Sequence, residues 1–403
     1  MWTRIAIVLL LGVLAACGHL PAPEPIASST PPDPRPRVLL SKPADDGHIV
    51  RLPVALVEIA GAALTPDAAR QDLVLALDFS SSAFEPTGRD VDGDGVIGVS
   101  KPWQPAVGTD GLRVSPLDWT TDPDDSVAGV ELAATRTLLS RLDPATTRVG
   151  LVSFGSNVRQ LLPLSSPESA LAALATAPLG AQIGGTNVSA ALVRAARLFG
   201  AAPEPATRRS ILLITDGFPT LPPPQQRAED LVVEEAERLA SAGIRVHVLA
   251  IASRQVQPRP VLEELARLTG GSFQSVDDPT ELPVRLANTS LSGVEAVDVR
   301  NATTGAAGLA VRLLPDGRFD AFVPLVPGEN RIEVQARSAA GASEVVQRTL
   351  RYEPAAADAP GSGEAAELLD ALRQRTLELE LLAELRERRQ QQRRELRIDP
   401  TRD

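Results

Sequence analysis

LVLALDFSSS, which runs from Leu73 to Ser82, is the stretch of sequence that decides the fold of this chain. Its apolar run, Leu73 to Leu77, is typical of a parallel strand that is buried on both faces of a sheet. Asp78, Ser80 and Ser82 follow at alternate positions where this strand would end. Because ligands of open α/β sheets bind beyond the carboxyl ends of the strands, these three side chains are predicted to begin a binding site.

Two later oxygen ligands also follow breaks between predicted elements. Thr186 lies in IGGTNVS, after a glycine turn, and Asp216 lies in ILLITDG, directly after another apolar strand. The complete set, D-x-S-x-S followed by T and then T-D-G, resembles the metal-ion-dependent adhesion site of von Willebrand factor type A domains. The resemblance implies an α/β fold, with a doubly wound, mostly parallel, Rossmann-like sheet. The alternative, an ordinary strand-end turn, is disfavoured because all five residues are present and in order.

The side chains of this set offer hydroxyl and carboxylate oxygens and no sulfur or imidazole, so they predict a hard cation, for which Mg²⁺ fits best. The resemblance implies that Ser80, Ser82 and Thr186 touch the ion, while Asp78 and Asp216 support it largely through water. Neutral inner ligands leave the charge of the ion poorly compensated, and an Asp or Glu from a protein ligand then completes the shell. The site therefore predicts binding rather than catalysis.

A second candidate metal site lies in an unusually long connection, residues 83–125, where the resembled family runs almost directly into a helix. The segment DVDGDGVIG matches the first half of a calcium loop. Its carboxylates come from Asp90, Asp92 and Asp94, and the Val96 carbonyl supplies a fourth oxygen. Lys101 stands where an EF-hand has its bidentate Glu, so an EF-hand is excluded. A Ca²⁺ loop closed by a remote acid is favoured over a merely polar turn, because three carboxylates this close repel without a cation. The candidates for the remote acid are Asp110, Asp122, Asp124 and Asp125.

The first 16 residues are typical of a secretory signal peptide, with Arg4 before an apolar run that is too short to span a bilayer comfortably. Leu14-Ala15-Ala16-Cys17 resembles a bacterial lipoprotein box, which implies that Cys17 carries the lipid anchor. Cys17 is the only cysteine; the alternative is a spare cysteine in a cleaved leader. The Pro-rich residues 17–37 predict an extended tether, and Gly18 favours the outer membrane over the inner one. No other segment is expected to span a membrane.

Short β patterns lie on either side of the predicted von Willebrand factor type A domain, residues 64–292. Residues 38–63 hold two such patterns, and residues 293–353 hold five. The first part resembles the opening of bacterial immunoglobulin-like domains, and two strands do not fold alone. We therefore predict one discontinuous immunoglobulin-like β-sandwich into which the α/β domain is inserted. The alternative is a strand pair that packs on its neighbour, followed by an independent sandwich.

Within residues 64–292, strand and helix patterns alternate as a doubly wound sheet requires. Helices are predicted at 126–142, 167–175, 187–199, 228–242 and 261–268, and strands at 148–154, 210–215, 244–251 and 272–276. An edge strand is predicted at 158–164. The last short helix ends near Thr289, with Asp278 as its N-cap and Pro279 as its first residue. His247 is predicted to be a core residue.

The end of the chain predicts a linker, residues 354–363, and a helix, residues 364–398. Four leucines follow a heptad seam that arginines interrupt: Leu368, Leu372, Leu379 and Leu382. Because the apolar part spans barely three heptads, a short coiled coil or docking helix and a frayed, solvated helix are equally open. The Arg-rich end, RERRQQQRRELR, is either a contact for anionic lipid or acidic partners or a solvated face.

The formal net charge of −11 excludes the electrostatic footprint of a nucleic-acid-binding protein. The leading hypothesis is a lipid-anchored outer-membrane protein of the cell envelope that binds an acidic residue of a protein ligand through Mg²⁺, in adhesion or envelope assembly. One alternative is a metal-dependent hydrolase, for which none of His19, His48 and His247 is a well-placed base. The other is a structural lipoprotein without a ligand at the site. An enzyme is not expected, and the oligomeric state is left open.

Overall fold

The computed structural model describes most of the chain between residues 35 and 380. The described residues are 35–66, 69–91, 93–101, 106–108, 111–113, 120–176, 184–200, 204, 206–251, 260–287, 289–338, 341–356, 363–377 and 379–380. The predicted signal peptide, Cys17 and nearly all of the tether lie outside them, as do Asp92, Asp110 and the Arg-rich end. Among the described residues, no helix combines the length and the apolar character needed to cross a membrane.

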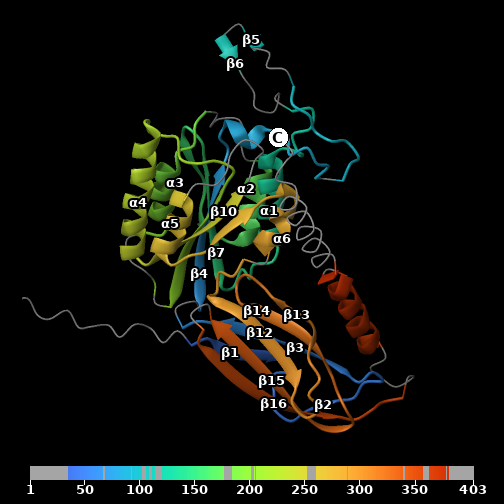
Figure 1. Cartoon of the computed structure of the whole chain (residues 1–403). Helices are drawn as coiled ribbons and strands as arrows, with labels where there is room; N and C mark the ends of the chain where they lie inside the picture. Colours follow the sequence, from blue (N-terminus) through green and yellow to red (C-terminus); the bar gives the residue numbers. More distant parts are fainter. Residues whose placement is uncertain are drawn as a thin grey trace, which may run out of the picture. The chain divides into compact units, whose positions relative to one another are not determined.

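A six-stranded sheet forms the centre of the α/β domain (Figure 1). Its strands, in spatial order, are β11 (Phe273–Val276), β10 (Ile244–Ile251), β9 (Thr207–Thr215), β4 (Arg70–Asp78), β7 (Thr147–Phe154) and β8 (Val158–Ser165). Neighbouring strands run parallel except β8, which pairs antiparallel with β7 at the edge. The apolar run of LVLALDFSSS therefore lies inside the sheet, and the strands predicted for this domain are confirmed.

Helices cover both faces of this sheet, because β4 alternates its side chains between two apolar clusters. Leu73, Leu75 and Leu77 belong to one cluster and Val74 and Ala76 to the other, and all five are buried. The first cluster is shared with α1 (Val127–Leu139), α2 (Pro167–Ala175) and α6 (Leu282–Ala287), and the second with α3 (Val188–Leu198), α4 (Gln225–Ser241) and α5 (Pro260–Thr269). The doubly wound fold is thus confirmed.

Two side chains of this domain have the local roles that the sequence predicts. Asp278 caps the short turn η3 (Pro279–Glu281), which leads into α6, by accepting a hydrogen bond from the Thr280 amide. His247 is 7% exposed in β10, and its Nδ1 lies 2.9 Å from Ser272 Oγ. Burial, together with the charges of nearby arginines, lowers the pKa of His247 to about 4. The imidazole is therefore neutral at neutral pH, as a core residue should be.

Two further four-stranded sheets combine strands that precede and follow the α/β domain in the sequence. One contains, in order, β1 (Arg37–Lys42), β3 (Leu56–Leu64), β14 (Arg318–Pro324) and β13 (Leu309–Leu313); the other contains β12 (Val294–Asn301), β15 (Gly328–Ser338), β16 (Ser343–Tyr352) and β2 (His48–Val50). β3 pairs antiparallel with β14, and β2 pairs parallel with β16. Both sheets contribute to one apolar core, which includes Ile59, Phe319 and Ile332. The short β2 is a third N-terminal strand that the sequence analysis did not predict.

Residues 363–377 form a helix that packs on these sheets. Leu368 contacts their shared core, and Arg375 forms ion pairs of 3.1 Å with Glu58 and 2.7 Å with Asp320. The guanidinium carbon of Arg375 also lies 4.5 Å from the ring centroid of Phe322. Part of the heptad seam is therefore used against strands of the same chain, which favours the docking helix over the coiled coil for this part. Leu382 and the rest of the predicted helix lie outside the described residues.

Candidate metal centre

The centre begins with Asp78, the last residue of β4, whose side chain is fully buried. Its Oδ1 accepts a hydrogen bond from the Ser80 amide (2.9 Å), and its Oδ2 accepts one from Thr215 Oγ1 (2.5 Å). Thr215 is the last residue of β9, the neighbouring strand. The Asp78 carboxylate therefore joins the carboxyl ends of two adjacent parallel strands.

Ser80, Ser82 and Asp216 lie in direct contact beside Asp78. Ser82 Oγ donates a hydrogen bond to Asp216 Oδ1 at 3.0 Å, and Ser80 Oγ lies 3.3 Å from Ser82 Oγ. A short 3-10 turn, η1 (Ser81–Phe84), follows Ser80 and is anchored by Phe84, which is buried in the core. The end of β4 and the turn after β9 thus place two hydroxyls and a carboxylate together.

Thr186 faces the same space from the turn that precedes α3. A Cβ atom at position 217 would lie 3.4 Å from Thr186 Oγ1 and 3.9 Å from Ser82 Oγ. This residue is Gly217, so the space between the two hydroxyls contains no side chain from that position. The structure therefore brings all five residues of the D-x-S-x-S, T and T-D-G set to one edge of the sheet.

Several carboxyl groups at this edge are buried without enough polar partners. Burial raises the pKa of Asp78, and burial followed by the charge of Asp78 raises the pKa of Asp216 to about 8. Asp216 Oδ2 is buried and has no hydrogen-bond partner among the described residues. A buried acceptor of this kind costs free energy unless a donor or a cation satisfies it. The residues present thus fit a hard divalent cation, because they offer oxygen ligands and because a cation would satisfy the buried carboxyl groups.

Glu131 is a further acid of the centre, and the sequence analysis did not single it out. It lies in α1, is 0% exposed, and its Oε2 accepts a hydrogen bond from the Asp78 amide at 3.2 Å. Burial, and then the charges of Asp78 and Asp216, raise its pKa well above the usual range of a glutamate. In the part of the chain that the structure describes, its other oxygen, Oε1, has no hydrogen-bond partner. Glu131 is therefore a third buried carboxyl group of the centre, beside those of Asp78 and Asp216.

The hydroxyl groups are essential to any metal site at this edge. In the described part of the chain, no group of three or more His, Cys, Asp or Glu side chains is placed to hold a metal by itself. Ser80, Ser82 and Thr186 would therefore have to supply ligands beside Asp78 and Asp216. Hydroxyl-rich coordination suits a hard cation such as Mg²⁺ and does not suit a metal that prefers sulfur or imidazole.

Thr220 holds Thr186 in place, which the sequence analysis also missed. The Thr186 amide donates to Thr220 Oγ1 (2.7 Å), and the Thr220 amide donates back to the Thr186 carbonyl (3.0 Å). A Cβ atom at Gly185 would lie only 2.6 Å from Thr220 Oγ1, so a glycine is needed for this close approach. The available signal was a hydroxyl four residues after Asp216, in TDGFPT.

Replacing Thr220 by Val is expected to weaken Mg²⁺ binding, because the buried Thr186 amide loses its acceptor and the Thr186 hydroxyl shifts. Residues that orient metal ligands typically contribute about 10–100-fold to metal affinity. Isothermal titration calorimetry with Mg²⁺ measures the loss. Thr220→Ser keeps the hydroxyl and is the matched control, so equal affinities of the Val and Ser variants would contradict this positioning role.

In the predicted calcium loop, the described carboxylates accept hydrogen bonds from the backbone of the loop itself. Asp90 accepts from the amides of Gly93 (2.7 Å) and Gly95 (3.0 Å), and Asp94 accepts from the Val96 amide (2.7 Å). Gly95 has φ +87°, a left-handed backbone conformation that favours glycine. Because Asp92 lies outside the described residues, occupation of the loop by Ca²⁺ stays a prediction.

Asp125 acts on the backbone of the same loop. It is 0% exposed, and its two oxygens accept hydrogen bonds from the amides of Val91 (2.6 Å) and Gly98 (2.7 Å). Asp125 was one of the four acids predicted as a remote ligand for Ca²⁺. In the structure its role is a clamp that joins the two ends of residues 91–98.

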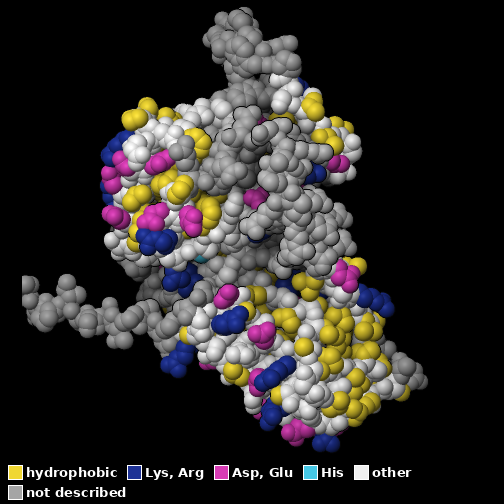
Figure 2. Space-filling view, viewed as in Figure 1, with side chains coloured by type: hydrophobic (Ala, Val, Ile, Leu, Met, Phe, Trp, Pro, Cys, Tyr) yellow, Lys and Arg dark blue, Asp and Glu magenta, His cyan; other side chains and the backbone are white. Residues whose placement is uncertain are grey.

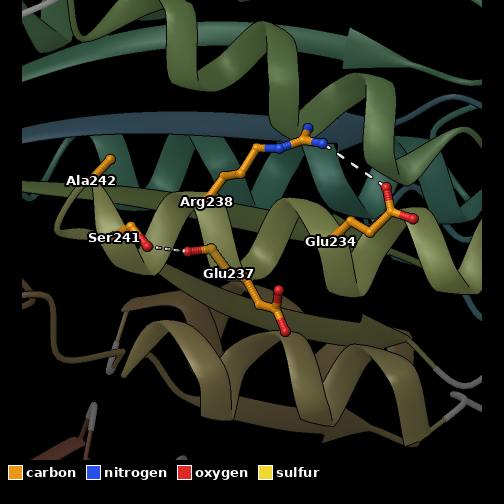
Figure 3. Close-up of a pocket in the computed structure, with 5 residues that line it drawn as sticks. All are labelled: Glu234, Glu237, Arg238, Ser241 and Ala242. Carbon is orange, nitrogen blue, oxygen red and sulfur yellow. Dashed lines mark hydrogen bonds and ion pairs between the residues drawn. The ribbon is translucent and has the colours of Figure 1, made fainter. Parts of the chain in front are cut away.

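Figure 3 shows the side chains that line a hollow on α4. The lining residues are Glu234, Glu237, Arg238, Ser241 and Ala242. Ser241 Oγ donates to the Glu237 carbonyl, and Arg238 lies 3.9 Å from Glu234. Because α4 begins at Gln225, soon after Asp216, its last residues lie toward the opposite edge of the sheet. None of the lining residues belongs to the metal centre.

Comparison with protein families identifies the central part of the chain. The model of the von Willebrand factor type A domain matches residues 131–287. The match begins inside α1, so it includes Thr186 and Asp216, while D-x-S-x-S lies before it, on the other side of the long connection. No curated protein sequence matches the chain.

Three solved structures are among those similar to parts of this chain. The conserved hypothetical protein BatB from Bacteroides thetaiotaomicron is 20% identical, over 54% of this chain and 99% of that one, with a TM-score of 0.35. A von Willebrand factor type A structure from Catenulispora acidiphila is 15% identical, over 79% and 74%, with a TM-score of 0.36. Proximal thread matrix protein 1 from the mussel byssus, with a zinc-occupied MIDAS motif, is 14% identical, over 57% and 48%, with a TM-score of 0.36. At these identities and TM-scores, the similarities carry no information about what this chain binds.

Proposed function

Because the chain contains a von Willebrand factor type A domain, we propose that it is a protein-binding module whose metal centre holds Mg²⁺ and captures an Asp or Glu of a protein ligand. The observation that carries the proposal is the meeting of three hydroxyls and two carboxylates at one edge of the sheet, where Asp216 Oδ2 is buried and no described residue donates to it. Such domains often act as metal-dependent protein-interaction modules.

Each residue of the centre has a distinct part in this proposal. Ser80, Ser82 and Thr186 would offer neutral oxygens to the ion. Asp78 and Asp216 would support the ion largely through water. The Ser82–Asp216 hydrogen bond, at 3.0 Å, orients the Ser82 hydroxyl, and Asp78 fixes the backbone at Ser80. A bound divalent ion supplies positive charge that these neutral ligands do not cancel, so it attracts an external carboxylate.

A hydrolase is the weaker alternative, because Glu131 and the two described histidines are poorly placed to move a proton at the metal centre. Glu131 is 0% exposed and its Oε2 accepts a hydrogen bond from the Asp78 amide, so a bound substrate would not reach it. His247 is neutral and buried in β10 beside Ser272, and His48 lies in β2. These positions support binding without turnover.

The cellular setting of this binding module is part of the proposal. The signal-like residues 1–16 and Cys17 support attachment to the outer membrane of the cell envelope through a lipid, with residues 17–37 as the tether. The acidic loop from Asp90 to Val96 supports a second, Ca²⁺-holding role beside the Mg²⁺ centre. Adhesion and envelope assembly are the processes that such a surface-held module would serve.

Affinity capture from an envelope extract tests the proposal, with the full chain as bait in Mg²⁺ or in EDTA. The test variant combines Asp78→Ala with Ser80→Ala, and the matched control combines Asp230→Ala with Ser241→Ala, both exposed on α4. We expect partners that are captured in Mg²⁺, lost in EDTA, lost with the test variant and kept with the control. Calorimetry with Mg²⁺ alone shows whether the test variant has lost the ion. Partners that survive both EDTA and the test variant, or turnover of substrate without capture, would contradict the proposed function.

A further inference from the structure

Three large apolar side chains stand exposed close together in the long connection between η1 and α1. Val96 is 52% exposed, Ile97 53% and Val99 56%. We call these three residues the apolar loop. A single exposed apolar residue is common on protein surfaces. Three within four residues form a cluster of apolar side chains that is exposed to solvent instead of being buried in the core. Their exposure therefore suggests a surface for binding.

The backbone under these side chains is held firmly, so the exposure does not come from a loosely packed segment. The Gly98 amide donates to Asp125 (2.7 Å), the Val99 amide donates to Thr121 Oγ1 (3.0 Å), and the Val99 carbonyl accepts from the Thr121 amide (3.0 Å). A Cβ atom at Gly98 would lie 3.0 Å from both Asp125 Cβ and Thr120 Oγ1. The backbone of the apolar loop is thus packed against residues 120–125 while its side chains project away. A preorganised surface of this kind loses little entropy when a partner binds.

The base of the apolar loop is joined to the metal centre by a short series of backbone hydrogen bonds. The Asp125 carbonyl accepts from the Thr87 amide (2.9 Å), and the Glu85 carbonyl accepts from the Val127 amide (3.2 Å). The Glu85 amide in turn donates to the carbonyl of Ser82, a residue of the centre, at 3.0 Å. In Figure 1, this connection lies beyond the same end of the sheet as η1. The base of the apolar loop is therefore held at the edge of the sheet that carries the metal centre.

We propose that the apolar loop is the second contact of the ligand, and that the ligand is a protein segment in which apolar side chains flank the acidic residue captured at the metal centre. This inference rests on the proposed function. The chain carries a net charge of −11, so long-range attraction does not favour an acidic partner in general. Apolar contact beside the metal would add affinity that long-range electrostatic attraction does not provide. It would also restrict binding to acidic residues that have apolar neighbours in the ligand.

A library of displayed peptides with a central Glu and four random residues on each side tests this proposal. The library is selected on the full chain in Mg²⁺, and bound peptides are released with EDTA. Three proteins are compared: the natural chain, the apolar-loop variant and a control variant. The apolar-loop variant carries Val96→Ser, Ile97→Ser and Val99→Ser. The control variant carries Leu309→Ser, Val326→Ser and Val345→Ser, at positions of similar exposure outside the α/β domain.

We expect EDTA-released peptides from the natural chain and the control to be enriched in Leu, Ile, Val or Phe beside the Glu. Selected peptides should bind the apolar-loop variant about 10–100-fold more weakly, although calorimetry should give that variant the same affinity for Mg²⁺. Glu peptides that are EDTA-released but show neither enrichment nor loss would overturn this inference and leave the proposed function standing. No EDTA-released peptides at all would overturn both.

Sedimentation of the same three proteins tests the competing occupant, a second copy of the chain. The proposal expects identical behaviour of all three at micromolar concentration. Self-association of the natural chain that is lost in the apolar-loop variant and kept in the control would show that these residues bind another copy, and would overturn the proposal.

Discussion

Mg²⁺ is expected to raise the free energy of unfolding of this chain far more at pH 8 than at pH 5. Without a metal, burial and the Asp78 charge raise the pKa of Asp216 to about 8, so the folded chain keeps this carboxyl protonated where the unfolded chain has lost the proton. The folded state then binds more protons than the unfolded state between about pH 4 and pH 8. Stability therefore falls as pH rises through this range, by about 1.4 kcal/mol per pH unit for each such carboxyl.

Urea unfolding at pH 5, 6, 7 and 8, in Mg²⁺ and in EDTA, measures this effect. A bound divalent ion favours the ionised carboxylates, so the loss of stability with pH should largely disappear in Mg²⁺. Asp216→Asn removes one of the carboxyls whose pKa is raised and should make the EDTA profile less steep, whereas Asp230→Asn, at an exposed position on α4, should leave it unchanged. The buried His247 gives an acid-side loss below about pH 6.5 in both conditions, so it cancels in the difference. Parallel profiles in Mg²⁺ and EDTA would show that the centre binds no ion linked to these acids.

Replacing Asp125 by Ala is expected to release the long connection beside the metal centre. The change leaves the amides of Val91 and Gly98 without their acceptor, and hydrogen bonds to a charged group are worth about 1.5–3 kcal/mol each. Hydrogen exchange should therefore become about a hundredfold faster or more at the amides of residues 91–99, since 1.4 kcal/mol corresponds to a factor of ten.

Two variants at and beside this position serve as controls. Asp124→Ala removes an exposed neighbouring carboxylate and should leave exchange in residues 91–99 unchanged. Asp125→Asn keeps one oxygen acceptor and should give an intermediate effect. If Asp124→Ala and Asp125→Ala speed exchange equally, the clamp described for Asp125 is wrong.

Much of the α/β domain could be predicted because its strands and helices carry strong local patterns. The run Leu73–Leu77 is continuous because side chains on both faces of β4 are buried, and the helix over residues 167–175 ends where its apolar period ends. Where a helix end lacks such an apolar period, the observed boundary differs from the predicted one. α4 begins at Gln225 rather than Ala228, because its first turn is polar and the extended Pro224 precedes it.

The residues that support the metal centre could not be predicted, because their roles depend on contacts between distant parts of the chain. A lone glutamate in an amphipathic helix normally indicates a solvated face, yet Glu131 is turned toward Asp78. Thr220 meets Thr186 only when the ends of two strands lie side by side. Asp125 was one of four acids predicted as a remote Ca²⁺ ligand, and its hydrogen bonds to the Val91 and Gly98 amides could not be predicted from its charge. The three-residue β2 is too short to show any alternation.

The pairing of β3 with β14, and of β2 with β16, has a consequence for the order of folding during synthesis. The first strands of the chain leave the ribosome long before their hydrogen-bonding partners, while the intervening α/β domain is completed in between. Until residues 294–352 emerge, β3 lacks β14 and β2 lacks β16, so one edge of β3 stays open to other extended chains. A nascent chain of this protein should therefore need protection at its amino-terminal strands even after its α/β domain has folded.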